Sequence, residues 1–162
     1  MPTAISLVSF KKEGVLWWLS FILPPQIIKF LLGPVAKPPN SFSPDRTFDF
    51  RLSTATVEVE KSNFTDLTGY HRILMPLNAS IRLTHHHKEV VLNPFQSYFF
   101  DGGDPVSSQG TCQDFNLIYK PSYQGHMSAI SPKESVKSQS RYQLIYALCP
   151  LTLEWGTNHS QT

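Results

Sequence analysis

The chain has 162 residues, a length that fits one domain or one and a half small ones. Its net charge is only +2 and its basic residues are scattered, so the composition excludes a strong electrostatic footprint for nucleic acid. Hydrophobic residues make up 41% of the chain, and 11 Phe, 6 Tyr and 3 Trp supply apolar area for a core.

Residues 1–46 follow no clear pattern and are treated as an atypical N-terminal arm. Gly14–Ala36 is apolar and follows two lysines, as in a signal peptide or a membrane anchor. Its uninterrupted piece, Val15–Leu23, is shorter than the ~20 residues that span a bilayer, so no membrane partner is expected despite the weak signal-like segment 15–36. Two other interpretations stay open: an arm packed on the main fold, or a segment that does not belong to the fold. Within this arm, we expect Trp17–Gly33 to pack poorly or to lie outside the barrel.

From about Thr47 onward the sequence is typical of β-structure. Thr47–Glu60 alternates with a period of two, which places Arg51, Ser53 and Ala55 on one face of a strand. Short apolar segments follow at regular spacing, separated by Gly, Pro and Asn turns. These segments are Arg72–Leu77, Ser80–His85, Glu89–Leu92, Ser97–Phe100, Asp114–Tyr119, His126–Ile130, Tyr142–Leu148 and Leu151–Trp155. The pattern predicts an all-β fold of antiparallel strands, built as a sandwich or a barrel.

Two connections shape the predicted organisation. Only Asn78 and Ala79 separate Arg72–Leu77 from Ser80–His85, which is a hairpin signal. Residues 132–140 are polar and predict a linker or an exposed loop. We therefore expect a main barrel over residues 47–130, followed by a linker and a partial second half over residues 131–162.

Two blocks of the sequence resemble the HutD family. Phe48–His87 carries an F-D-F-R-L-S-x-A-x-V strand and an F-x-x-x-x-G-x-x-R turn from Phe64 to Arg72, and Phe100–Lys120 carries the D-F-N strand. The blocks stand in the family's order at close to its spacing, over about half of the chain. The resemblance implies a cupin-type double-stranded β-helix, that is, a jelly-roll barrel with two cupin-like halves.

The sequence departs from the family pattern at both ends. Family members carry a Trp-x-Gly-Gly-Thr type motif ahead of the F-D-F-R strand, where this chain has the apolar stretch Trp17–Gly33. A locally shifted reading frame is one hypothesis for that difference. Family members also continue past a segment like Leu151–Trp155, so it stays open whether the second half-barrel is complete.

His85, His87 and Glu89 form the most conspicuous candidate metal site. Residues two apart share a face of a strand, and imidazoles with a carboxylate suit iron, manganese or zinc. They lie at the tip between two strands, however, where strand geometry ends. A solvated hairpin tip is the favoured interpretation, so no metal and no other cofactor is predicted.

Polar residues on the predicted core strands form the candidate ligand site. Arg51 and Ser53 lie on one strand, and Arg72, Asp114 and Asn116 on others. A guanidinium in a barrel mouth could hold a carboxylate with two hydrogen bonds. Arg51 could instead form an internal ion pair with Asp114, and an exposed position at the start of a strand is favoured for Arg72.

The leading functional hypothesis is a non-enzymatic protein that binds a small carboxylate ligand. The resemblance implies a link to the control of histidine utilisation and a ligand such as N-formylglutamate. The alternatives are a metal-dependent cupin enzyme that uses the histidine tip, and a disrupted, non-functional family member. Cys112 and Cys149 match no zinc or redox spacing, so reduced thiols in a cytoplasmic protein are expected. A homodimer is an open alternative for the oligomeric state.

Overall fold

The computed structural model describes residues 5–10, 22–23, 48–57, 60–131, 133–134, 142–148 and 151–152. Within these ranges every regular secondary-structure element is a β-strand, and every pair of neighbouring strands is antiparallel. This confirms the predicted all-β fold. None of the described residues forms a helix that is long and apolar enough to cross a bilayer.

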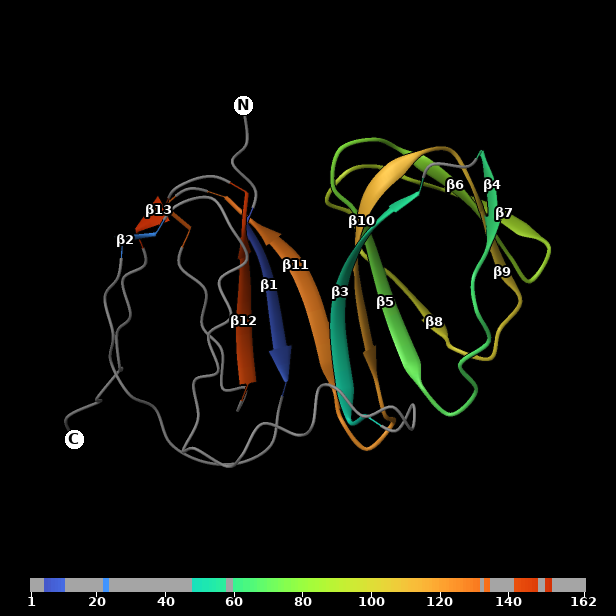
Figure 1. The fold of residues 1–162 in the computed structure, drawn as a ribbon, viewed down its shortest axis with the longest axis horizontal. Coiled ribbons are helices and arrows are strands. Elements are labelled where there is room, and N and C mark those ends of the chain that lie inside the picture. The colour runs from blue at the N-terminus through green and yellow to red at the C-terminus, as the bar shows by residue number, and fades with distance from the viewer. Residues whose placement is uncertain are drawn as a thin grey trace.

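The strands form three main sheets arranged as successive layers (Figure 1). The middle sheet has the order β3 (Phe50–Val57), β10 (Cys112–Tyr119), β5 (His71–Pro76) and β8 (Tyr98–Asp101). The outer sheet has the order β4 (Lys61–Asn63), β9 (Val106–Gln109), β6 (Ile81–His85) and β7 (Lys88–Leu92). The terminal sheet has the order β11 (Gly125–Ile130), β1 (Ile5–Phe10) and β12 (Tyr142–Ala147). A short pair joins β2 (Ile22–Leu23) to β13 (Leu151–Thr152).

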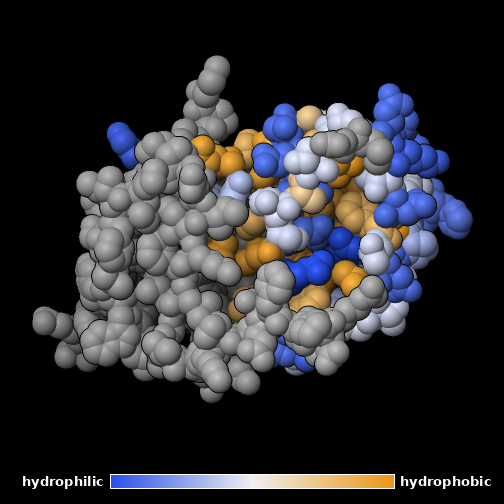
Figure 2. Space-filling model, viewed as in Figure 1, coloured by the Kyte–Doolittle hydropathy of each residue, from blue (hydrophilic) through white to orange (hydrophobic). Residues whose placement is uncertain are grey.

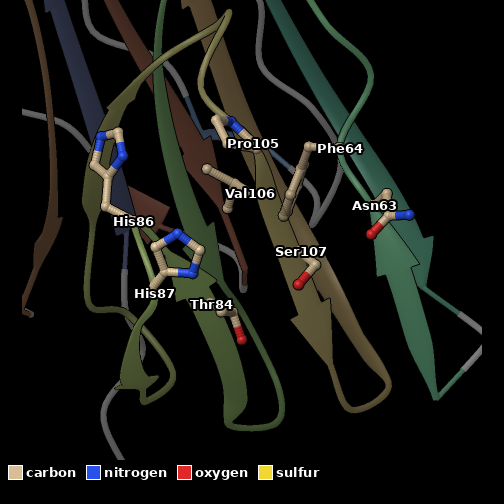
Figure 3. Close-up of a pocket in the computed structure, with 8 residues that line it drawn as sticks. All are labelled: Asn63, Phe64, Thr84, His86, His87, Pro105, Val106 and Ser107. Atoms are coloured by element: carbon tan, nitrogen blue, oxygen red, sulfur yellow. The ribbon is translucent and has the colours of Figure 1, made fainter.

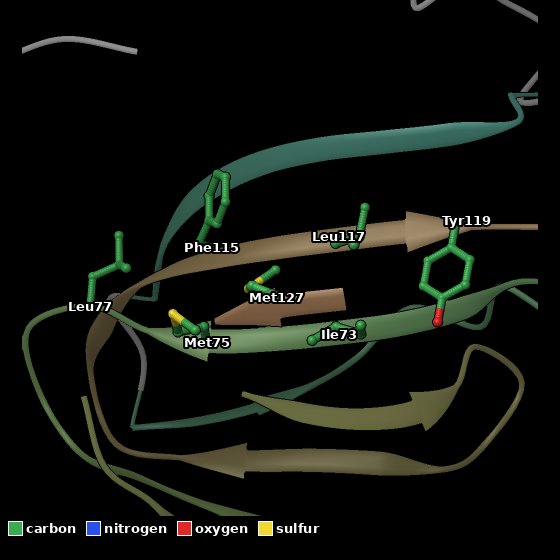
Figure 4. Close-up of a cluster of buried hydrophobic side chains, with 7 residues drawn as sticks. All are labelled: Ile73, Met75, Leu77, Phe115, Leu117, Tyr119 and Met127. Carbon is green, nitrogen blue, oxygen red and sulfur yellow. The ribbon is translucent and has the colours of Figure 1, made fainter. Parts of the chain in front are cut away.

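The middle sheet carries a buried core on the face that looks toward the terminal sheet. Alternate residues of β10, namely Phe115, Leu117 and Tyr119, point to this side because side chains alternate along a strand. They pack with Met127 of β11, as Figure 4 shows. The buried residues of this cluster are Ile73, Met75, Leu77, Phe115, Leu117, Tyr119 and Met127.

The opposite face of the middle sheet packs against the outer sheet. Its buried cluster consists of Leu74, Ile81, Leu83, Leu92, Phe100, Val106 and Cys112. Cys112 is a free buried thiol, and burial raises its pKa, whereas Cys149 lies outside the described residues. Among the described residues no strand pairing joins the middle sheet to the outer sheet. The two sheets are therefore the walls of a cupin-like barrel that is not closed by hydrogen bonds.

The connection between β5 and β6 differs from the predicted hairpin. β5 pairs with β10 and β8, whereas β6 pairs with β7 and β9, so the two consecutive strands lie in different sheets. Arg72 and Leu77 at the two ends of this segment are both buried, and so are the residues between them. A strand that is buried on both faces does not alternate clearly, and the two-residue gap is then a corner of the barrel instead of a turn.

The N-terminal part contributes a strand that the sequence did not predict. β1 lies between β11 and β12 in the terminal sheet and pairs with both along six residues. In the apolar segment 15–36, only Ile22–Leu23 is described, and the rest of that segment lies outside the described residues. Most of the predicted linker at 132–140 and the C-terminal residues after 152 also lie outside them.

Gly102 permits close packing of two loops beside the middle sheet. Its N–H donates to the carbonyl of Tyr70 at 2.7 Å, and its own carbonyl accepts from the N–H of Leu67 at 2.7 Å. A Cβ atom at this position would lie 2.5 Å from the Leu67 carbonyl oxygen and 2.9 Å from that of Tyr70.

We expect Gly102→Ala to lower the free energy of unfolding by about 2 kcal/mol, because backbone atoms must move to make room. Urea denaturation measures this loss. Gly103→Ala is the control, because the Cβ atom there would meet the rotatable hydroxyl of Thr68. Equal stability of the two variants would contradict the explanation.

Candidate functional site

The strand register places all five predicted ligand-site residues on the face of the middle sheet that looks toward the outer sheet. Asn116 lies opposite Ser53, and Asp114 lies two residues before Asn116 on β10. Arg51 on β3 and Arg72 on β5 both lie opposite Ile118, one on each side of β10. Residues directly opposite in adjacent strands share a face, so the structure brings these side chains to one side of the sheet.

Arg72 is buried, with only 5% of its surface exposed, in contrast to the exposed position expected for it. Its guanidinium lies over the adjacent rings of Phe64 and Phe100, 4.9 Å and 5.1 Å from their centroids, which are 5.5 Å apart. It donates to the carbonyl of Thr65 at 3.2 Å and to Oδ1 of Asn116 at 3.5 Å. Burial, followed by repulsion from Arg51, lowers the pKa of Arg72 to about 10. The exposed position was expected because Arg72 begins a strand, but both neighbouring strands and the Phe64 loop cover it.

Arg51, and not Arg72, is the exposed arginine of this face. Its guanidinium lies 5.2 Å from the centroid of the Phe48 ring. No ion pair joins Arg51 to Asp114, although both belong to the described residues. Arg51 therefore does not form the internal ion pair with Asp114 that the sequence left open. β3 is an edge strand of the middle sheet, which leaves the end of its Arg51 side chain in solvent.

Asp114 is a buried carboxyl group, with 3% of its surface exposed. Burial raises its pKa to about 6, against the opposing effects of a backbone hydrogen bond from Ala55 and the charge of Arg72. Its Oδ1 atom is buried without a hydrogen-bond partner among the described residues. The side chain thus carries a charge near neutral pH that its surroundings only partly balance.

These side chains belong to a set that we call the polar cluster. It consists of the four buried polar or charged residues in the described part of the chain, Arg72, Ser108, Asp114 and Asn116. Ser108 comes from β9 of the outer sheet, opposite the inward-facing Leu83. The polar cluster therefore has members on both walls. Figure 2 shows a hollowed face over these sheets, where strongly hydrophilic residues gather among apolar ones.

Three atoms of the polar cluster are buried and lack any partner among the described residues: Arg72 Nε, Ser108 Oγ and Asp114 Oδ1. Buried polar groups almost always find a hydrogen-bond partner, because leaving one unpaired costs about 1–3 kcal/mol. These three atoms, which come from both facing sheets, are therefore candidate contacts for a polar molecule.

Sequence reasoning missed Ser108, Phe64 and Phe100 as parts of this site. The signal for Phe64 was present in the F-x-x-x-x-G-x-x-R turn, because its first residue is Phe64 and its last is Arg72. The glycine of the turn, Gly69, has a φ of 87°, a backbone conformation that residues with a side chain rarely adopt. This turn of the chain lets Phe64 cover Arg72.

The structure does not bring the weak metal-site candidates His85, His87 and Glu89 together at the histidine tip. His86 and His87, with φ values of 48° and 61°, form a two-residue turn between β6 and β7. Positive φ at both positions is the geometry of a tight hairpin. Glu89 then pairs in register with Thr84 and lies 3.8 Å from Arg82, so it does not meet His85. The period-two argument failed because the turn interrupts the strand.

A separate hollow of about 470 Å³ lies beside this tip. His86 and His87 line it together with residues of β6, β9 and the β4–β5 connection, as Figure 3 shows. The eight lining residues are Asn63, Phe64, Thr84, His86, His87, Pro105, Val106 and Ser107. This set contains no arginine, lysine or carboxylate, whereas the polar cluster contains Arg72 and Asp114.

Comparisons with known proteins identify relatives of this chain. A family model described as HutD matches residues 35–160. A conserved protein of unknown function from Pseudomonas aeruginosa PAO1 is 36% identical over 47% of this chain and 41% of its own, with a TM-score of 0.44. HutD from Pseudomonas fluorescens SBW25, solved in a formate condition, is 25% identical over 70% of this chain and 61% of its own, with a TM-score of 0.46. The matches thus span less than two thirds of either solved chain. No curated protein matches the chain.

Proposed function

The chain belongs to the HutD family, and we propose that it binds a small carboxylate ligand between its middle and outer sheets without transforming it. The observation that supports this proposal is the polar cluster with its three unpartnered atoms on facing walls. A buried guanidinium, a hydroxyl and a carboxyl could each regain a hydrogen bond from one polar ligand.

Within the polar cluster, the guanidinium of Arg72 favours an anionic group of the ligand, although the cluster also holds the carboxyl group of Asp114. Arg72 is buried at a cost, and its two hydrogen bonds are long, at 3.2 Å and 3.5 Å. A ligand carboxylate beside the free Nε would supply the opposite charge that this cation lacks. The amide of Asn116 lies within reach of Arg72 and could hold a formamide or amide group of the same ligand.

The family suggests the chemical class of the ligand. N-formylglutamate, an intermediate of histidine degradation, carries two carboxylates and a formamide, which match the groups of the polar cluster. We therefore place this chain in the control of histidine utilisation. The cytoplasmic location, the absence of nucleic-acid and membrane partners and the homodimer remain part of the same proposal.

The enzyme alternative required His85, His87 and Glu89 to hold one metal ion. The tight turn separates these three side chains, so that alternative has lost its set of ligands. Within the described residues, the polar cluster holds no nucleophile beside a general base, since its hydroxyl, Ser108 Oγ, has no partner. Binding without chemistry is the function that this geometry supports best.

The proposal predicts that N-formylglutamate stabilises the full chain. At a ligand concentration 100 times the dissociation constant, the free energy of unfolding should rise by about 2.7 kcal/mol. Thermal unfolding with N-formylglutamate and with its uncharged diamide measures this effect, in buffer with a metal chelator so that metal ions contribute nothing.

Stabilisation by the dicarboxylate alone would support a carboxylate site. Equal stabilisation by both compounds would contradict it, because the charge would then play no part. If the wider set of histidine-pathway metabolites also leaves the melting temperature unchanged, the chain is a non-functional member of the family.

A further inference from the structure

A second group of side chains gathers at the barrel rim, apart from the polar cluster. His85 is the last residue of β6, His86 begins the tight turn, and Asp104 lies in the loop between β8 and β9. One nitrogen or oxygen atom of each residue lies within 4.8 Å of the corresponding atoms of the other two. Nε2 of His85 is 3.0 Å from Oδ2 of Asp104, and Nε2 of His86 is 3.6 Å from the same oxygen.

These three side chains are held in place by the surrounding structure. Nδ1 of His85 lies 3.0 Å from the hydroxyl of Tyr98, so both nitrogens of this ring have partners. The ring of His86 stacks on that of His85 at a centroid distance of 4.1 Å. Oδ2 of Asp104 also accepts from the backbone N–H of Asp101 at 3.2 Å. An arrangement with such supports loses little freedom when a ligand binds.

We propose that His85, His86 and Asp104 bind a divalent transition-metal ion such as Zn²⁺. Two imidazoles and one carboxylate are the three-residue ligand set of many zinc sites, which keep a fourth position open. Ligand atoms about 2.1 Å from a tetrahedral ion stand about 3.4 Å apart, and the distances of 3.0 Å and 3.6 Å lie on either side of that value.

The exposure of the three side chains agrees with access for an ion. His85 is nearly covered, with 12% of its side chain exposed, while 24% of Asp104 and 63% of His86 are exposed. An ion could therefore enter from the side of His86, beside the hollow shown in Figure 3. Binding through Nε2 of His85 requires the ring proton to stand on Nδ1, where it donates to the Tyr98 oxygen.

The site differs from the metal site that the sequence suggested. His87 and Glu89 are not part of it, and Asp104, which is 19 residues away from His85 in the sequence, replaces them. It is also independent of the proposed ligand, because no residue of the polar cluster belongs to it.

Isothermal titration of the tag-free full chain with ZnCl₂, after treatment with a chelator, tests the proposal. We expect one zinc ion to bind per chain. His86→Ala and Asp104→Asn each remove one ligand, so each should weaken zinc binding by about 10-fold or more. His87→Ala is the matched control, since it changes the other residue of the same exposed turn. It should bind zinc within about two-fold of the unchanged chain, because His87 lies outside the ligand set.

Cobalt provides a second readout, because tetrahedral Co²⁺ absorbs strongly in the visible range. The unchanged chain and His87→Ala should show this absorption, and His86→Ala should lose most of it. The proposal fails if no zinc binds, or if His87→Ala weakens binding as much as His86→Ala, since the metal would then bind to the run of histidines at large. Circular dichroism of each variant shows that its strands are intact.

Discussion

Replacing Asp114 with asparagine should make the protein more stable at pH 8 and should remove much of the pH dependence of its stability between pH 4 and 6. The pKa of Asp114 is raised from 3.8 to about 6, chiefly because the carboxyl group is buried. Above pH 6 the group is ionised in the folded and in the unfolded chain, and the folded chain bears the cost of burying the charge. Below pH 4 it is protonated in both states, and that cost is gone.

The sign of the effect follows from proton uptake. Between pH 4 and 6 the folded chain binds a proton at Asp114 that the unfolded chain does not, so this group makes the protein more stable as the pH falls. A difference of about two pKa units corresponds to about 3 kcal/mol. Asparagine has the same shape without the charge, and its one amide oxygen can take the place of the carboxylate oxygen that accepts the backbone hydrogen bond from Ala55.

Urea denaturation of the unchanged chain and of Asp114→Asn at several pH values measures the effect. The two stabilities should be similar at pH 4 and should differ by up to about 3 kcal/mol at pH 8. Glu60→Gln makes the same change of charge at an exposed position and should have little effect. A less stable Asp114→Asn at pH 8 would mean that the carboxylate has a strong partner.

Periodicity predicted which face of each strand carries the site, because side chains alternate wherever a strand is regular. Asp114, Asn116, Ser53 and Arg51 share one face, as their positions two apart in the sequence require. Alternation gives no information about depth, which depends on what covers the sheet. It therefore could not show that Arg51 lies on an edge strand and is exposed, while Arg72 lies on an inner strand and is buried.

Strand pairing was harder to predict than strand position. The segments from Arg72 to His85 were found from their apolar residues, but their pairing depends on contacts far away in the sequence. β5 pairs with β10, about 40 residues later, and not with its neighbour β6. β1 was missed because residues 1–46 were treated as one arm without a clear pattern, and the partners of Ile5–Phe10, β11 and β12, lie at the other end of the chain. The group of His85, His86 and Asp104 was missed for the same reason, since a loop brings Asp104 to the hairpin.

Replacing Arg72 with methionine should weaken the binding of N-formylglutamate by about 100-fold or more, while leaving the fold as stable as before or more stable. This prediction rests on the proposed function. The guanidinium supplies the charge and the donors for a carboxylate, and each charge-assisted hydrogen bond contributes about 1.5–3 kcal/mol. Two such bonds together account for a loss of about 3 kcal/mol, which corresponds to about 150-fold.

The expected stability of Arg72→Met follows from what surrounds this side chain. Methionine keeps much of the length of arginine and can pack against the adjacent rings of Phe64 and Phe100. The fold would lose two long hydrogen bonds and two contacts between the cation and the rings, but it would no longer bury a charge without an ion-pair partner. Replacing a whole buried ion pair with well-packed apolar groups often leaves a protein equally stable or stabilises it by about 1–4 kcal/mol. The expected stability of Arg72→Met therefore applies near pH 5, where Asp114, with its pKa raised to about 6, is largely protonated and loses no partner charge.

Arg51→Met is the matched control, because it makes the same change on the same face of the middle sheet. Arg51 lies on β3, on the other side of β10 from Arg72. Arg51 is exposed, so water screens its charge, and its replacement should weaken binding by only about two- to three-fold. Titration calorimetry with N-formylglutamate, together with thermal unfolding of each variant, separates the effect on binding from the effect on stability. If Arg51→Met abolishes binding and Arg72→Met does not, the ligand lies at the rim beside Phe48, and Arg72 serves the fold alone.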